Sequence, residues 1–270
     1  MNTHDIPQPV KRFKADHLPV EVYQDMQALG RAAAVQAATL LREAVERSGE
    51  ARVILASANS QLSFIEALTL EHKLPWEKIT CFHMDEYIGI DSNHSASFAG
   101  WMKKRVLDKV KPAAFHFLNG KAEDVEAECR RYAGLIQEKP IDLTCMGIGE
   151  NGHIAFNDPP VADFDDPLPI KPVELDEMCK NQQVGEGHFK SLDTVPTHAF
   201  SLTVPTLLSG RRILCIVPEE RKAAAVAKTI HGPVETACPS SILRRQSHAV
   251  LMLDREAASQ LDWDAIDVTG

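Results

Sequence analysis

The sequence predicts an α/β fold in which a mainly parallel sheet is covered by helices on both faces. Short apolar strands alternate with amphipathic helical patterns along most of the chain, as expected for β-α-β units. The chain has 270 residues, a length that one large domain accommodates. It shows no repeat, low-complexity linker or composition shift. We therefore predict a single domain over residues 1–270.

Each element follows from a local pattern. The first helix is expected at 20–47, where Ala, Leu and Val recur at helical spacing. Short apolar runs predict strands at 53–56, 79–84, 115–118, 141–146, 212–217 and 249–253. Amphipathic patterns predict helices at 63–71, 96–107, 122–138, 219–230 and 236–243. The proline- and acid-rich segment 159–172 is interpreted as an ordered excursion or lid.

Composition excludes several classes of function. Hydrophobic residues make up 44% and charged residues 25% of the chain, as in globular proteins. The net charge of −9 argues against nucleic acid and anionic membranes as partners. The six cysteines are widely spaced and several lie in apolar runs, so we expect reduced, structural thiols. With no signal peptide and no long apolar run, we expect a cytoplasmic location; the sequence is compatible with a homo-oligomer.

The most informative segment is the glycine-rich turn after the predicted strand 141–146. Glycines at 147, 149 and 152 let the backbone turn sharply around His153, and a carboxylate, Asp158, follows five residues later. Residues 147–152 also match G-x-G-x-x-G. The dinucleotide interpretation is disfavoured, because that fingerprint requires a long helix after the last glycine and prolines at 159–160 come too soon.

A second strand end suits an anion. The polar turn Ser57, Ala58, Asn59 and Ser60 leaves a strand and opens a helix, where free N–H groups favour phosphate. An ordinary helix cap is the alternative interpretation. Lys222, near the start of another predicted helix, is unfavourable with respect to the helix dipole, and a bound phosphate would explain it.

A third strand end carries a candidate base. Asp85 directly follows the apolar run 79–84 and could act as a general base; by itself the motif fits a capping or surface carboxylate at least as well. Ligands of open α/β sheets bind outside the carboxyl ends of the strands. Because Asp85, His153 and Asp158 are all expected at that edge, catalysis becomes the favoured interpretation.

With these residues, the chain resembles the glucosamine-6-phosphate deaminase (isomerase) family, whose superfamily includes 6-phosphogluconolactonase. The resemblance covers roughly residues 20–255 and is strongest at 82–89 and 147–159. It implies a Rossmann-like fold and isomerisation of an amino-sugar phosphate with loss of ammonia: glucosamine 6-phosphate, or a close analogue, and water would give fructose 6-phosphate and ammonia. It implies no metal and no organic cofactor.

The resemblance also implies roles by position. Asp85 matches the general base that moves a proton between carbons 1 and 2, and His153 matches the histidine that assists ring opening. The turn 57–60 and Lys222 match phosphate-binding elements. We also count Glu86 and Gly149 among the substrate-binding residues, and Asn151 and Asp158 with the catalytic group.

Three departures from the family pattern stand out. The family usually has aspartate at the position of Asn151 and glutamate at that of Asp158, so the groups around the histidine are altered. In the segment 182–189, no arginine is found where the family places one for phosphate; His188 or Lys190 is a candidate substitute. These changes suggest a related sugar phosphate or a weakened deaminase.

Two alternatives stay open. A 6-phosphogluconolactonase-like hydrolase would share the architecture, although such enzymes typically have arginine where this chain has Tyr87. A non-catalytic sugar-phosphate sensor would keep Ser60 and Lys222 and lose proton-transfer groups; Asn151 and Asp158 favour it, whereas intact Asp85 and His153 oppose it.

Overall fold

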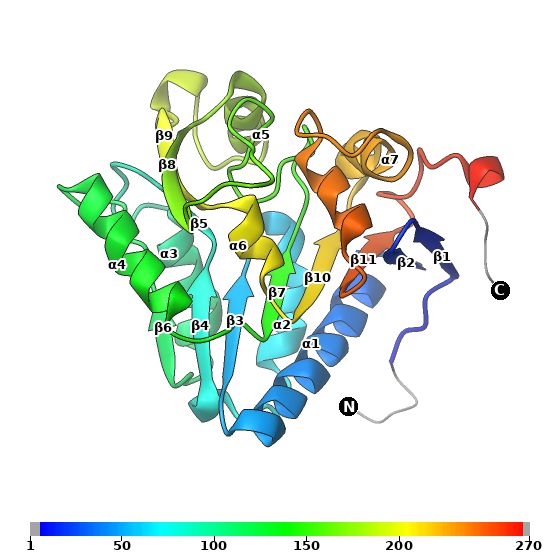
Figure 1. Ribbon diagram of the computed structural model, residues 1–270, viewed down its shortest axis with the longest axis horizontal. Coiled ribbons are helices and arrows are strands. Elements are labelled where there is room, and N and C mark those ends of the chain that lie inside the picture. The colour runs from blue at the N-terminus through cyan, green and yellow to red at the C-terminus, as the bar shows by residue number, and fades with distance from the viewer. Residues whose placement is uncertain (1–5, 267–270) are drawn as a thin grey trace.

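A computed structural model of the chain describes residues 6–266 and leaves 1–5 and 267–270 undescribed. An eight-stranded sheet runs through the centre (Figure 1). Its strands are β1 (Lys11–Ala15), β2 (Leu18–Tyr23), β3 (Ala51–Leu55), β4 (Ile79–His83), β6 (Ala114–His116), β7 (Leu143–Met146), β10 (Arg212–Val217) and β11 (Ala249–Asp254). The spatial order is β1-β2-β11-β10-β7-β3-β4-β6, with only the β1–β2 pair antiparallel.

Helices cover both faces of this sheet. They are α1 (Met26–Ser48), α2 (Leu62–Thr69), α3 (Phe98–Met102), α4 (Val125–Gln137), α5 (Glu177–Gly185), α6 (Val204–Leu208) and α7 (Ala223–His231). The apolar residues of α1 and α2 pack on one face, and those of α4, α6 and α7 pack on the other. The α/β prediction, with a mainly parallel sheet and helices on both faces, is confirmed.

A second, three-stranded antiparallel sheet lies beside the first, toward the top of Figure 1 together with α5. It consists of β5 (Asp85–Tyr87), β9 (His198–Leu202) and β8 (Ile170–Glu174), in that order. Only Met84 separates β4 of the large sheet from β5 of the small one. The chain therefore changes sheets just before Asp85, and the residues that follow this point face a different layer of the fold.

The six predicted strands are present, but the prediction of one helix over 20–47 is wrong at its start. Residues 18–23 form β2, whose side chains alternate between buried and partly buried positions. The helix begins only after Asp25, whose carboxylate accepts a hydrogen bond from the Ala28 N–H at 2.7 Å. Such an N-cap fixes a helix start more sharply than apolar spacing does.

Other boundaries also differ from the prediction. The expected helix at 236–243 is a 3₁₀ helix, Pro239–Arg245. The expected helix at 96–107 is α3 followed by a π-helical turn, Lys103–Leu107. The excursion predicted at 159–172 leads into β8, an edge strand of the small sheet. The single-domain prediction runs to both chain ends, which lie outside the described residues, and it stays a prediction.

Two further expectations concern the whole chain. All six cysteines are buried and free, as predicted. Among the helices of residues 6–266, none has both the length and the apolarity needed to span a bilayer.

Candidate active site

A cavity lies at the carboxyl ends of the parallel strands, where the small sheet and α5 meet the large sheet. Residues after β3, β7 and β10 line it from the large sheet, and residues from α5 and the segment after it close the opposite side. Its lining includes Ser57, Ser60, Asp85, Gly149, His153, Gln182, Gln183, Glu186, His188 and Lys222. The predicted strand ends therefore do converge on one site.

Asp85 enters this cavity from β5. It is 7% exposed, and its Oδ1 has no hydrogen-bond partner among the described residues. Burial, and secondarily the charge of Glu86, raise the pKa of Asp85 well above its usual value of 3.8. A carboxylate that is poorly solvated binds a proton more strongly than one in water, so Asp85 has the character of a base.

Hydrogen bonds tie the Asp85 strand to the His153 turn. Asp85 pairs with Ser201 in the β5–β9 ladder, and the Ser201 hydroxyl accepts the N–H of Phe156 at 3.1 Å. The Asn157 amide donates to the carbonyls of Ile154 and Leu202, both at 2.8 Å. These buried contacts fix the turn that carries the histidine relative to the strand that carries the aspartate.

The ring of His153 is held by Asp158, whereas Asn151 accepts the backbone N–H of His153 at 2.9 Å. Its Nδ1 lies 2.8 Å from Oδ1 of Asp158, and Asp158 is fully buried. The Asn151 amide donates to the same oxygen at 2.8 Å and to Asp176 at 3.2 Å. Burial alone would raise the pKa of Asp158, but His153 and Asn151 outweigh it and hold that pKa below its usual range. Asp158 is therefore an ionised acceptor at neutral pH.

The glycines of the turn have separate physical reasons. A Cβ on Gly149 would lie 2.1 Å from Nε2 of His153, so only glycine leaves room for the ring. Gly152 has a φ of +88°, a left-handed conformation that favours glycine. After Gly152 the chain makes a turn with an isolated bridge between Ile154 and Asn157, and no helix begins until α5. The dinucleotide fingerprint lacks its helix here.

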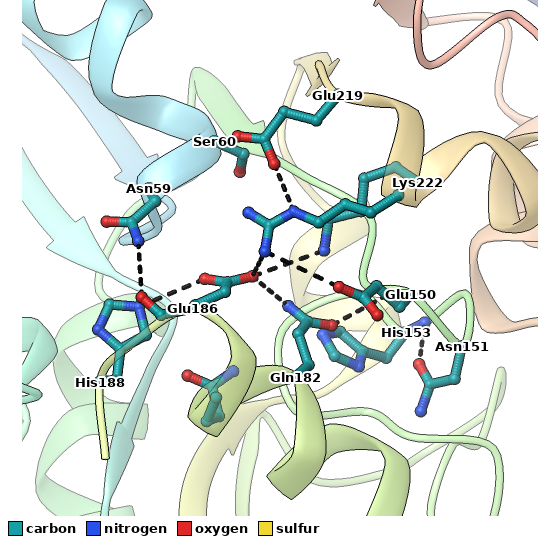
Figure 2. Close-up of polar contacts among 12 residues, drawn as sticks. Asn59, Ser60, Glu150, Asn151, His153, Gln182, Glu186, His188, Glu219 and Lys222 are labelled. Carbon is teal, nitrogen blue, oxygen red and sulfur yellow. Dashed lines mark hydrogen bonds and ion pairs between the residues drawn. The ribbon is translucent and has the colours of Figure 1, made fainter. Parts of the chain in front are cut away.

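Two cations lie next to each other at this site: Lys222 lines the cavity, and its neighbour Arg221 lies behind the lining. Lys222 is 3% exposed and ends the 3₁₀ helix Glu220–Lys222 before α7. The side chain of its neighbour Arg221 is one-third exposed. Both approach Glu186: Arg221 Nη1 lies 3.2 Å and Lys222 Nζ 3.8 Å from the same carboxylate oxygen. Figure 2 shows Glu186 between Lys222 and His188.

The sequence-predicted residues divide into two groups. Ser57, Ala58, Ser60, Asp85, Gly149, His153 and Lys222 line the cavity. The other four lie behind the lining. Asn151 and Asp158 support His153, and Asn59 donates its amide to the Glu186 carbonyl at 3.4 Å. Glu86 points away, because its carboxylate accepts N–H and O–H groups at the start of α3.

Several lining residues escaped the sequence prediction. Gln182, Gln183 and Glu186 belong to α5 and the turn after it, and Phe98 and Phe156 add an apolar wall. Arg221 does not line the cavity itself, but it pairs with Glu186, within the segment 182–189 where the resemblance led us to look for an arginine. Its place beside Lys222 in the sequence was the one available signal. The contacts of α5 could not be foreseen, because α5 is brought over the cavity only by the small sheet.

One cluster has the residue types of a metal site. Ligand atoms of His153, Asp158 and Cys179 lie within 4.8 Å of one another. Burial raises the pKa of the Cys179 thiol well above its usual value, whereas a metal binds the thiolate. The Nδ1 of His153 is already engaged by Asp158. The closeness of these three side chains is therefore explained by the support that Asp158 gives His153.

Comparison with known proteins places this site in a class. Residues 24–162 match the family described as glucosamine-6-phosphate isomerases/6-phosphogluconolactonase. The glucosamine-6-phosphate deaminase of Listeria innocua is 34% identical over 214 residues, which are 79% of this chain and 89% of that protein. The chain belongs to the glucosamine-6-phosphate isomerase/6-phosphogluconolactonase family.

Within that family the similarity is greater on the deaminase side. A glucosamine-6-phosphate deaminase of Bacillus thuringiensis is 32% identical over 220 residues, 82% of each chain. A solved structure described as a monomeric glucosamine-6-phosphate deaminase superimposes with a TM-score of 0.82 at 32% identity, covering 89% of this chain and 98% of the other. A 6-phosphogluconolactonase from Shewanella baltica, at 17% identity and a TM-score of 0.73, shares the fold. The superposition covers 87% of this chain and 97% of the lactonase chain.

Proposed function

We propose that this protein is an enzyme that isomerises and deaminates an amino-sugar phosphate, glucosamine 6-phosphate or a close analogue. The observation that carries the proposal is the shared cavity. A buried, unpaired carboxylate (Asp85), a carboxylate-supported imidazole (His153) and a buried lysine (Lys222) all line it. Groups for proton transfer and for anion binding in one cavity are what this chemistry requires.

The proposed reaction uses these groups in turn. His153, through Nε2, exchanges the proton needed to open the sugar ring. Asp85 then removes the proton from carbon 2 and returns it to carbon 1, while one amine proton passes to the carbonyl oxygen on carbon 1. The amine at carbon 2 thereby becomes an imine and carbon 1 carries a hydroxyl. Water adds to that imine and ammonia leaves, which gives the ketose. The contacts to the phosphate group hold the ring-opened sugar in place while the proton moves.

Similarity to deaminases favours this activity over lactone hydrolysis. The relatives with 32–34% identity are named as deaminases, and the lactonase likeness at 17% identity is one of fold. Classification as a hydrolase, a cytoplasmic location and a homo-oligomer all stay predictions; the similar solved structure is described as monomeric.

The direct test is ammonia release by purified protein supplied with glucosamine 6-phosphate, with galactosamine 6-phosphate run in parallel. Release from the gluco sugar supports the proposal. Release only from the galacto sugar assigns Asn151 and Asp158 to sugar specificity. Binding of either sugar phosphate, with ammonia released from neither, favours the sensor. Hydrolysis of 6-phosphogluconolactone favours the alternative enzyme.

A further inference from the structure

Glu186 occupies the anion-binding end of the cavity. Its side chain is 4% exposed, and one carboxylate oxygen faces both Arg221 and Lys222 and accepts the Gln182 amide at 2.9 Å. The other oxygen lies 3.3 Å from Nε2 of His188. Figure 2 shows Lys222, Gln182 and His188 converging on Glu186, with Asn59 bonded to its backbone carbonyl. The carboxylate is thus fixed from several directions.

The surrounding charges leave little room for a second anion. Arg221 also pairs with Glu219, and its Nη1 lies 3.8 Å from Glu150. Two cations are therefore shared among three carboxylates. Burial alone would raise the pKa of Glu186, but His188, Lys222 and Arg221 lower it to about 2. Glu186 is consequently charged throughout the neutral range.

A phosphate monoester brings about two negative charges at pH 7. To contact Lys222 and Arg221 it must either lie beside a buried carboxylate or displace that carboxylate from its partners. Like charges in a poorly solvated site repel strongly, and displacement breaks the contacts made by Gln182, His188 and both cations. Either route weakens phosphate binding relative to a site with two free cations.

We propose that Glu186 is a specificity-determining residue that discriminates against a dianionic phosphate at this end of the substrate. The phosphate of an amino-sugar phosphate is then held less tightly than at a site with two free cations, and an analogue with a free hydroxyl in its place loses less by comparison. The inference rests on the proposed function, because it takes the sugar to lie between Asp85 and Lys222. It also gives the altered segment 182–189 a role of its own.

The test removes the charge and keeps the shape. Glu186→Gln is compared with the wild type by calorimetric titration with inorganic phosphate. Glu150→Gln is the matched control, because it also removes one carboxylate near Arg221 but does not line the cavity. We expect phosphate to bind E186Q at least about tenfold more tightly than the wild type, and E150Q to stay within about threefold.

The proposal is overturned if E186Q binds phosphate no more tightly than the wild type, or if E150Q shows the same gain. Glu186→Ala, judged by the same criteria, decides the question if the glutamine variant does not fold. Phosphate binding needs no turnover, so it separates this inference from the proposed activity.

The kinetic counterpart is the ratio of kcat/KM for glucosamine 6-phosphate to that for glucosamine. This ratio should rise about tenfold in E186Q and stay unchanged in E150Q. A ratio that falls or stays constant in E186Q contradicts the proposal. Absence of turnover in all variants would reject the proposed function, and the phosphate titration would then decide on Glu186 alone.

Discussion

Asp158 fixes the orientation of His153, with its Oδ1 2.8 Å from Nδ1 of the ring. An ionised carboxylate can only accept a hydrogen bond, so Nδ1 of the neutral ring carries the proton and Nε2 is free to accept one. Nε2 lies on the Gly149 side of the ring, where the cavity begins. The pair therefore presents its reactive nitrogen to the substrate.

Replacing Asp158 with Asn should lower kcat by about 10²- to 10⁴-fold with little change in KM, because an amide supports the wrong tautomer. Steady-state kinetics measures this. Asp165→Asn, an exposed carboxylate in the same loop, should leave kcat unchanged. An active D158N enzyme would mean that His153 does not depend on this orientation.

Replacing Asp85 with Asn should lower kcat by about 10²- to 10⁴-fold, because the base that moves the proton is lost. The dissociation constant for glucosamine 6-phosphate should change by less than about threefold, since the anion-binding contacts are untouched. Calorimetry on the inactive variant measures that binding. An unchanged rate would remove Asp85 from the mechanism.

The pH dependence should reveal the raised pKa of Asp85. A general base works only when deprotonated, so kcat/KM should rise with pH along an acid limb whose midpoint lies above 3.8. Glu86→Gln removes one cause of the shift and should move this limb to lower pH. The substrate's phosphate titrates identically in both enzymes, so the difference reports Asp85. A limb that does not move would assign it to another group.

Glu86 itself should matter for stability more than for binding. Its carboxylate accepts the Ser97 hydroxyl at 2.7 Å and the N–H groups of Phe98 and Ala99 at 3.1 and 2.8 Å. Glu86→Gln places an amide against these donors, which should cost about 1.5–3 kcal/mol in the free energy of unfolding by urea. Unchanged stability with a raised KM would instead support the substrate-binding role predicted from the family.

Gly149→Ala should impair catalysis without preventing folding. The new Cβ would lie 2.1 Å from Nε2 of His153, so the ring has to move, and a displacement of this order can cost about a hundredfold in kcat. Gly134→Ala is the matched control, because its Cβ would meet no atom within 4 Å. It should keep full activity and gain up to about 1 kcal/mol in helix stability. Full activity in G149A would show that the ring position is not critical.

The sequence was most informative where one local pattern decides the structure. Apolar runs such as 212–217 predicted buried strands correctly, and the topology then brings Ser57, His153 and Lys222 to one edge. It was less informative where two patterns compete. Residues 20–25 have helical spacing, but they also alternate, and pairing with β11 at the sheet decided the outcome.

The candidate site was predictable in its parts but not in its pairings. Asn151 and Asp158 were both counted in the catalytic group, but only the structure separates their contacts. Asp158 reaches the ring of His153, because the turn after Gly152 brings the carboxylate back to it, and Asn151 accepts the backbone N–H. Glu186 carried no recognisable motif. Its role depends on α5 crossing the cavity, a contact between segments far apart in the chain that no local pattern encodes.

The change of sheet at Met84 has a mechanical consequence. Asp85 travels with the three-stranded sheet, whereas Lys222 follows a strand of the eight-stranded one. A small rotation between these two sheets would change the distance from Asp85 to the sugar, while Lys222 would stay with the eight-stranded sheet. Substitutions where the two sheets meet, such as at Ser201, would then slow proton transfer without touching the substrate, because they would shift Asp85 relative to Lys222.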